Sequence, residues 1–492
     1  MSPRATIVGS GPNGLVAAVT LARAGYSVRV LEAAGAAGGS ARTAELTLPG
    51  FRHDVGSAVH PVARSSVWFR AFGLDRRVEW LVPDASFAHP LPSGPTAIAW
   101  RDLDRTAASL GADGTRWRRL IQPLRDHLDG VVALTGDHLL RVPRHPVTAA
   151  AFAVRTALLG TAPSLALRTE AGLVLWAGVA AHAARTLPSL AGSAAGLLLA
   201  AHAHAATGWP VPRGGAGAIT DALIDDLLAH GGELSCNENV VDVAALDWGD
   251  AAAGDVLVLA GSPRLAATVP GIPGSYAAAL GRYRYGPGLA KIDLALDGPV
   301  PWRDPDLGRA VTVHVGGTAE QVRASAAGVA RGRLSPAPYV LVAQPSVIDA
   351  SRAPAGAAVL WAYLHVPRGA AALDPSEPIL RRLEEFAPGI RDRIIGRHVT
   401  RASQLAARNP AAIGGDGLGG LLTLRQAVRS PVVSTVPWRT PARGVYLAGS
   451  ALPPGPGVTG MPGWYAARTV LTDARGSVPR LEDLFGASAM GE

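Results

Sequence analysis

Three glycines and one glutamate near the N-terminus have the spacing of a dinucleotide-binding site. Gly9, Gly11 and Gly14 form a GxGxxG motif directly after the apolar run 5–8, and Glu32 ends a second apolar run at 27–31. In a βαβ unit the first glycine permits a tight turn, the second admits a diphosphate, and the third lets the helix pack closely. An acid roughly 20 residues further on accepts hydrogen bonds from ribose hydroxyls. We therefore expect a strand at 5–8, a helix at 15–24 and a second strand at 27–31.

A second glycine pair follows this unit and points to a flavin. The segment Gly38-Gly39-Ser40-Ala41-Arg42 resembles the glycine pair with arginine found in the large FAD family of amine oxidases and phytoene desaturases. The resemblance implies that these glycines pass close to the flavin diphosphate and that Arg42 pairs with a phosphate. It continues through 51–57, where the family places a Gly-Ser pair near the isoalloxazine ring.

The C-terminal part of the chain carries a matching signature. Residues 444–450 have the pattern of a buried strand, and a Pro/Gly loop at 452–457 precedes Val-Thr-Gly-Met at 458–461. This segment resembles the C-terminal signature of phytoene desaturase-like enzymes. A helix that begins there would direct its positive dipole end at the flavin pyrimidine ring and stabilise negative charge on it.

A central block completes the predicted cofactor site. A helix is expected at 219–230, a strand and turn at 233–243, and a buried strand at 255–260. In the family, the segment that contains Val240 passes near the adenosine of FAD. The resemblance implies the following cofactor contacts: Gly9, Gly11, Pro12, Asn13, Gly14, Glu32, Ala33, Gly38, Gly39, Ser40, Arg42, Gly56, Ser57, Val240, Gly449, Ser450, Val458, Thr459, Gly460 and Met461.

These motifs predict an α/β fold in which both chain ends and a central block build one Rossmann-type FAD-binding domain. An inserted α+β substrate-binding domain and a helical cap make up the rest. The expected ranges are 1–75, 211–270 and 431–478 for the three parts of the FAD-binding domain. The substrate domain takes 76–210, mostly helical, and 271–430, where strands at 291–296, 339–342 and 359–364 should pair. A C-terminal tail takes 479–492.

Lys291 is the only lysine in a chain that is otherwise saturated with arginine. It begins the strand predicted at 291–296, whose alternation indicates one wet face. In the amine oxidase branch, a lysine on the corresponding strand holds a water at flavin N5, so Lys291 is our candidate catalytic residue. His53 and His60 flank the flavin-proximal segment, and His60 is a weaker candidate for proton transfer. His202 and His204 are two residues apart and so point to different faces of a helix, which favours structural or substrate-lining roles, and we expect no metal site.

Composition narrows the possible functions. The chain has 492 residues, a formal net charge of +8 and one cysteine, Cys236, so a dithiol redox relay is excluded. The sequence contains no dense Lys/Arg block of the kind that would predict nucleic-acid binding. The apolar runs at 171–184 and 190–206 are too short and interrupted to span a membrane. We expect a cytoplasmic protein that could rest on a membrane surface.

The favoured function is flavin-dependent desaturation, in which a largely apolar substrate gives a hydride to flavin N5. A further GxGxxG at 415–420 has no preceding strand, so we interpret it as a loop. Without a second dinucleotide fold, electrons would leave for oxygen or a quinone-like acceptor. Three alternatives stay open: an amine oxidase, in which Thr459-Gly460 leaves the aromatic cage incomplete; a redox-neutral flavin isomerase; and a non-catalytic flavoprotein. The sequence leaves the oligomeric state open.

Overall fold

Strands from the two chain ends and from the middle of the chain form one parallel sheet. The structure is a computed structural model that describes residues 2–477 and 480–486. The strand order is β16-β10-β1-β2-β9, and every neighbouring pair is parallel. The strands are β1 (Arg4–Val8), β2 (Ser27–Glu32), β9 (Glu233–Cys236), β10 (Val256–Leu259) and β16 (Val445–Leu447). The predicted Rossmann-type domain is therefore confirmed.

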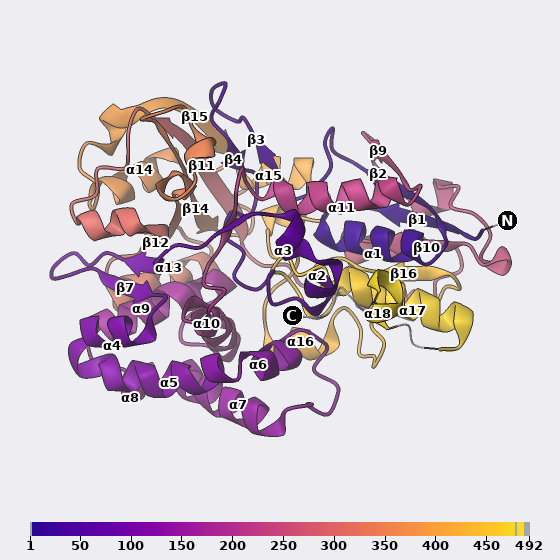
Figure 1. Ribbon diagram of the computed structural model, residues 1–492, viewed down its shortest axis with the longest axis horizontal. Coiled ribbons are helices and arrows are strands. Elements are labelled where there is room, and N and C mark those ends of the chain that lie inside the picture. The colour runs from indigo at the N-terminus through magenta and orange to yellow at the C-terminus, as the bar shows by residue number, and fades with distance from the viewer. Residues whose placement is uncertain (1, 478–479, 487–492) are drawn as a thin grey trace.

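Three helices cover this sheet. They are α1 (Pro12–Arg23), α11 (Gly217–Ala229) and α17 (Met461–Arg475). Helix α1 contacts both of the others, and the three lie side by side along the sheet (Figure 1). Their inward side chains, among them Leu15, Ile219 and Val470, are buried in one core with the strands. The helices predicted at 15–24 and 219–230 are confirmed, and each begins slightly earlier than expected.

A second, mixed sheet stands beside the first (Figure 1). Its strand order is β15-β11-β14-β13-β12-β6-β7; β12 and β6 are parallel, and the other neighbours are antiparallel. The strands are β6 (Ala85–His89), β7 (Ala97–Trp100), β11 (Gly288–Leu296), β12 (Ala310–Val315), β13 (Val340–Ala343), β14 (Ala358–Val366) and β15 (Ile394–Thr400). The three strands predicted to pair are adjacent as β11-β14-β13. Two short ribbons, β3 (Thr43–Ala44) with β4 (His53–Asp54) and β5 (Trp80–Leu81) with β8 (Val211–Pro212), complete the strands.

The expectation that strand 291–296 has one wet face is wrong. Strand β11 is hydrogen bonded on both edges, to β14 and β15, and its residues are buried from Ala290 to Leu296. Asp293 is fully buried among them. The alternation of polar and apolar residues therefore reflects a buried polar cluster on one face, not exposure to solvent.

A layer of helices packs against the second sheet. Figure 1 shows α4 to α10 below it. The helices are α4 (Leu103–Ser109), α5 (Gly114–Asp126), α6 (Leu128–Thr135), α7 (Pro146–Thr161), α8 (Pro163–Ala166), α9 (Glu170–Ala180) and α10 (Leu190–Ala203). Range 76–210 is thus mostly helical as predicted, but it also gives β6 and β7 to the second sheet. These strands are short, and all of their residues are buried, so they show no alternation that would reveal them in the sequence.

The remaining helices are short or lie at the periphery. They are α2 (Val67–Phe72), α3 (Leu74–Arg77), α12 (Gly274–Gly281), α13 (Ala319–Ala330), α14 (Ser376–Glu384), α15 (Ala402–Arg408), α16 (Leu424–Arg429) and α18 (Leu481–Phe485). Of the tail predicted at 479–492, residues 479 and 487–492 lie outside the described residues. The described part packs Phe485 against Trp68 of α2, with ring centroids 5.3 Å apart. None of the helices in the described part of the chain combines the length and apolar character needed to cross a membrane.

Candidate functional site

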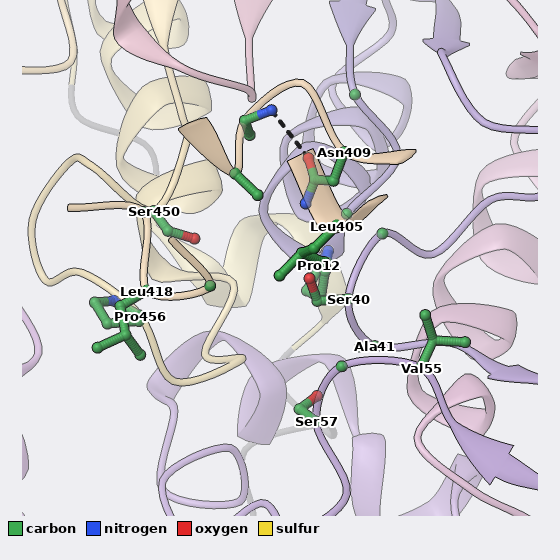
Figure 2. A pocket seen from close by; sticks show the side chains of 18 of the residues that line it. Pro12, Ser40, Ala41, Val55, Ser57, Leu405, Asn409, Leu418, Ser450 and Pro456 are labelled. Atoms are coloured by element: carbon green, nitrogen blue, oxygen red, sulfur yellow. Dashed lines mark hydrogen bonds between the residues drawn. The ribbon is translucent and has the colours of Figure 1, made fainter. Parts of the chain in front are cut away.

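A large cavity lies between the two sheets. Its volume is about 730 Å³, and residues from both sheets and from the helical layer line it. Figure 2 shows Pro12 and Ser40 from the N-terminal part beside Leu405 and Asn409, with Ser450 on the opposite side. Segments far apart in the sequence therefore meet around one space.

The N-terminus of α1 opens into this cavity. Gly11 is the N-cap residue and has an extended backbone. No side chain caps this helix end by a hydrogen bond, and Pro12 is the first helical residue. A Cβ atom added at Gly11 would meet no atom within 4 Å, whereas one at Gly14 would lie 1.9 Å from the Gly9 carbonyl oxygen. Gly11 therefore leaves space at the uncapped helix end, and Gly14 is required for close packing. Free N–H groups and the positive helix dipole make this end a site for a phosphate.

Glu32 lines the same cavity at the end of β2. Its Oε2 accepts hydrogen bonds from the Ser10 backbone N–H at 2.9 Å and the Ser10 hydroxyl at 2.5 Å, and its Oε1 accepts from the Ala34 N–H at 2.8 Å. Each carboxylate oxygen has two lone pairs, so Oε1 retains capacity for another donor. The carboxylate is thus held rigidly with one acceptor position left for a ribose hydroxyl.

Arg42 supplies a cation to this part of the cavity. Its Nη1 donates to the Ala36 carbonyl at 3.1 Å, while its Nε is buried without a hydrogen-bond partner among the described residues. An unpaired buried N–H of a guanidinium is costly, and a bound phosphate oxygen would satisfy it. The opening at Gly11, the acceptor on Glu32 and this orphaned donor fit a dinucleotide diphosphate with its ribose.

Most of the predicted cofactor contacts line the cavity. These are Gly9, Gly11, Pro12, Asn13, Glu32, Ala33, Gly39, Ser40, Arg42, Gly56, Ser57, Val240, Ser450 and Val458. The others pack behind its wall: Gly14, Gly38, Gly449, Thr459, Gly460 and Met461. Among these, Gly449 and Gly460 would place a Cβ 2.1 Å from the Gly261 carbonyl oxygen and 2.4 Å from Val16, so they allow close packing.

The C-terminal signature joins the cavity through Ser450 and Val458. The Asn13 side-chain amide donates to the Ser450 hydroxyl at 3.4 Å, which links α1 to the loop after β16. Val458 has a left-handed backbone (φ 55°), a strained conformation for a β-branched residue. Helix α17 begins just beyond it at Met461, as the sequence indicates, although Met461 itself is buried in the core.

Lys291 lies on β11 and lines the cavity from the side of the second sheet. Its Nζ donates to Asp293 Oδ1 and to the Asp54 carbonyl, each at 3.0 Å, and lies 5.4 Å from the centre of the Trp361 ring. Burial raises the pKa of the Asp293 carboxyl above its usual range, and the Lys291 charge opposes that shift. The lone lysine is therefore a fixed, paired cation at the cavity wall.

A buried ionic cluster continues behind Lys291. Arg352 donates from Nη2 to Asp54 at 2.7 Å and from Nε to Asp349 at 2.9 Å, and neither the guanidinium nor these carboxylates are exposed. His53 Nδ1 lies 3.8 Å from Asp293 Oδ1, and burial lowers the pKa of His53 to about 3. The cluster fixes β4 against β11 and the segment 349–352, which positions the lysine.

The other histidines considered from the sequence lie in the core. His60 is buried outside the cavity lining, neither ring nitrogen has a partner among the described residues, and burial lowers its pKa to about 4. His202 contacts the Leu198 carbonyl and the Ser65 hydroxyl, and His204 accepts from the Trp117 indole at 3.1 Å. His202 and His204 therefore hold helix α10 in place, and His60 does not contact the cavity.

Sequence reasoning missed two parts of the lining. The first is the segment from Leu405 to Gly419, which covers the cavity; the GxGxxG within it is a loop, as predicted. The second is the contribution of the helical layer, His182, Leu199 and Trp209. Neither set has a local motif, because long-range packing alone brings it to the cofactor segments.

Comparisons with known proteins agree with this arrangement. Residues 7–73 match the model of the NAD(P)-binding Rossmann-like domain. A rat protein named pyridine nucleotide-disulfide oxidoreductase domain-containing protein 2 is 24% identical, over 96% of this chain and 94% of its own length.

Solved structures of similar shape cover nearly the whole chain. An oxidoreductase from Methanosarcina mazei has a TM-score of 0.60 at 16% identity, covering 95% of this chain and 99% of that one. Wild-type putrescine oxidase bound to putrescine has a TM-score of 0.59 at 18% identity, covering 97% of this chain and 100% of that one. The chain has the fold of the amine oxidase-type oxidoreductases. At this level of identity the likeness establishes the fold, and the reaction has to be inferred from the residues of the site.

Proposed function

We propose that the protein is an FAD-dependent oxidoreductase that removes a hydride from a largely apolar organic substrate. The observation that carries this proposal is the continuity of the cavity. It runs from the uncapped N-terminus of α1 at Gly11 to the wall of the second sheet at Lys291 and Trp361. One space can therefore hold a dinucleotide and a substrate side by side.

The cofactor residues divide the work of holding FAD. Gly11 and the N-terminus of α1 would take the diphosphate together with Arg42, and Glu32 would accept from the ribose. Ser57 and Val458 line the same cavity and would help to enclose the flavin ring. Bound flavin supplies a hydride acceptor, which no side chain of this chain can provide.

The chemistry of the second-sheet wall supports an apolar substrate. Leu341, Ala343, Trp361 and Tyr363 line it, and Leu199 and Trp209 face it from the helical layer. Trp361 and Tyr363 stack with ring centroids 5.5 Å apart. Such a wall excludes water from the reacting carbon and orients an apolar molecule by contact area.

Amine oxidation is the second candidate, because the stacked Trp361 and Tyr363 offer aromatic faces to a cation. Against it, the Trp361 ring already has a cation beside it, because the Lys291 Nζ lies 5.4 Å from the ring centre. The neighbouring side chains Leu341 and Ala343 are apolar, so we rank oxidation of an apolar substrate first.

Lys291 has the position of a water-holding or charge-stabilising group. Its Nζ has three donors, of which two are used by Asp293 and the Asp54 carbonyl. The third is free to donate to a water or a substrate oxygen in the cavity. Electrons would then leave for oxygen or a quinone-like acceptor, because the single cysteine cannot form a dithiol relay.

Anaerobic bleaching of the flavin tests the proposal. The purified protein should be yellow, and its visible absorbance should fall when an oxidisable polyene precursor or other apolar substrate is added without oxygen. Bleaching by amines alone would favour the second candidate. A colourless protein that cannot take up FAD would overturn the proposal, and a bound flavin that no compound reduces would favour an isomerase or a non-catalytic role.

We further propose that the outer face of α7, with the segments on either side of it, rests on an anionic membrane surface. Val147 and Val154 on α7 are 82% and 66% exposed, and Val142 before α7 and Leu165 on α8 are 87% and 69% exposed. No acidic residue occurs between Asp137 and Glu170. Exposed apolar side chains beside arginines suit an interfacial helix. The protein should sediment with phosphatidylglycerol vesicles and less with phosphatidylcholine vesicles, and Val147→Glu/Val154→Glu should abolish this. Equal sedimentation of variant and parent would contradict it.

A further inference from the structure

A pair of histidines lies at the end of the cavity that the second sheet and the helical layer enclose. His182, in the short 3₁₀ turn Ala181–Ala183 after α9, lines the cavity, and its Nε2 lies 2.8 Å from Nε2 of His314 on β12. His314 is fully buried. Thr312, two residues earlier on β12 and therefore on the same face, also lines the cavity. The pair is thus part of the substrate wall.

The surroundings of His314 determine which nitrogen carries its proton. A Cβ added at Gly178 of α9 would lie 2.7 Å from His314 Nδ1, so this nitrogen faces the helix backbone, and it has no partner among the described residues. A proton there would be a buried donor without an acceptor, which is unfavourable. The favoured tautomer therefore carries the proton on Nε2 and donates it to His182.

This tautomer fixes the state of His182. Because His182 Nε2 accepts from His314, a neutral His182 must carry its proton on Nδ1. The Nδ1 atoms of His89 and His314 are buried without a hydrogen-bond partner among the described residues. The Nδ1 atom of His182, which lines the cavity, is not buried in this way, and no described residue accepts a hydrogen bond from it. Burial lowers the pKa of His182 to about 3, so the ring is neutral at physiological pH. This end of the cavity thus contains an oriented, neutral N–H donor.

Apart from the Thr312 hydroxyl, the side chains around His182 at this end of the cavity are apolar or already paired. Trp209 packs its ring against His182 with centroids 5.6 Å apart and donates its own N–H to the Leu199 carbonyl at 3.0 Å. Leu341 and Ala343 lie opposite on β13. Lys291 is neutralised by Asp293, so it offers little attraction to an anionic head group.

We propose that His182 is the polar anchor of the substrate cavity, donating from Nδ1 to a neutral oxygen on an otherwise apolar substrate. The substrate class is then an apolar molecule with a hydroxyl, ether or carbonyl oxygen away from the reacting carbon. This inference deepens the proposed function and rests on it for the identity of the cavity. An uncharged donor at the buried end of the cavity favours such neutral oxygens over a carboxylate. A carboxylate would lose its hydration there, and no group at that end compensates for this cost.

Two probes of equal shape test the anchor. Binding of 2-decanone and of 2-methyldec-1-ene, which differ as C=O against C=CH2, is measured by calorimetry on the protein as purified with its flavin. His182→Phe should weaken binding of the ketone about 5-fold, which corresponds to the loss of one neutral hydrogen bond, and should leave binding of the alkene unchanged. His182→Gln, which keeps a donor, should retain ketone affinity, and His145→Phe, the same change at an exposed histidine outside the cavity lining, should change neither probe.

Each outcome separates this inference from the proposed function. Equal weakening of both probes by His182→Phe, or no change in either, overturns the anchor, as does an equal loss of ketone selectivity in His145→Phe. The calorimetric readout needs no turnover. A protein that holds no flavin, or whose flavin no substrate bleaches, would therefore refute the proposed function while the ketone–alkene comparison still reports on His182.

Discussion

Lys291 and Asp293 form an ion pair two residues apart on one face of β11, with Nζ 3.0 Å from Oδ1 and the carboxylate fully buried. The pair is part of the cavity wall, and the Asp54 carbonyl accepts a second hydrogen bond from the lysine there. A buried charge is stable only with its partner, so the two residues must be considered together. The lysine's place on the strand was predicted from the sequence, and the structure shows its pairing with Asp293.

Replacing Lys291 with methionine should affect both stability and catalysis. The change leaves Asp293 without its cation, and removing one partner of a buried pair costs about 3–5 kcal/mol. Lys291→Met/Asp293→Asn should recover most of that loss in chemical denaturation while flavin reduction or reoxidation stays slow in stopped-flow absorbance. FAD should stay bound in both variants. Normal kinetics in the double variant would reduce Lys291 to a structural residue.

A side chain at Gly11 should displace the cofactor without unfolding the protein. A Cβ there meets no protein atom within 4 Å, so Gly11→Val should fold, yet its side chain would occupy the space expected for the diphosphate. The FAD content of the purified variant, read from its visible spectrum, should fall at least tenfold. Gly274→Ala is a matched control, because its Cβ also meets open space, away from the cavity. Full FAD content in Gly11→Val would contradict the site.

Removing the guanidinium of Arg42 should weaken the binding of FAD more than it lowers the stability of the fold. The Nε of Arg42 is buried and has no partner among the described residues, so in the protein without FAD the substitution removes an unsatisfied donor. Arg42→Met keeps much of the side-chain bulk. It should raise the Kd for FAD about 10-fold or more, the value of a charged hydrogen bond, and leave the apoprotein at least as stable in urea. An unchanged Kd would show that Arg42 does not contact the diphosphate.

The sequence predicted what local patterns encode. The βαβ unit around Gly9, Gly11 and Gly14 is continuous in the chain, so its turns, helix and terminal Glu32 are visible as one motif. Strand β11 was also predicted, and the i, i+2 spacing of Lys291 and Asp293 could have revealed their pairing.

Other parts of the site have no local signal. His182 and the segment from Leu405 to Gly419 reach the cavity only through packing between distant elements. Strands β6 and β7 are too short for a clear period. The buried cluster around Arg352 hid the environment of β11, because a polar residue within a strand is usually a sign of exposure.

Acid should destabilise the fold through its buried histidines. Burial lowers the pKa of His89 to about 3 and those of His60, His202 and His204 to about 4, and all four are at most 4% exposed. The unfolded chain binds protons below pH 6.5 while the folded chain does not, so these groups reduce stability as the pH falls from about 6.5 to about 4.

Each of these histidines contributes about 1.4 kcal/mol per pH unit once the pH is well below 6.5. The urea midpoint should therefore be flat between pH 7 and 8 and fall steeply from pH 6 to pH 4.5. His204→Gln, which keeps an acceptor for the Trp117 indole, should make that fall shallower; His145→Gln, at an exposed position, should not. A urea midpoint that stays constant down to pH 4.5 would mean that these rings are protonated in the folded protein.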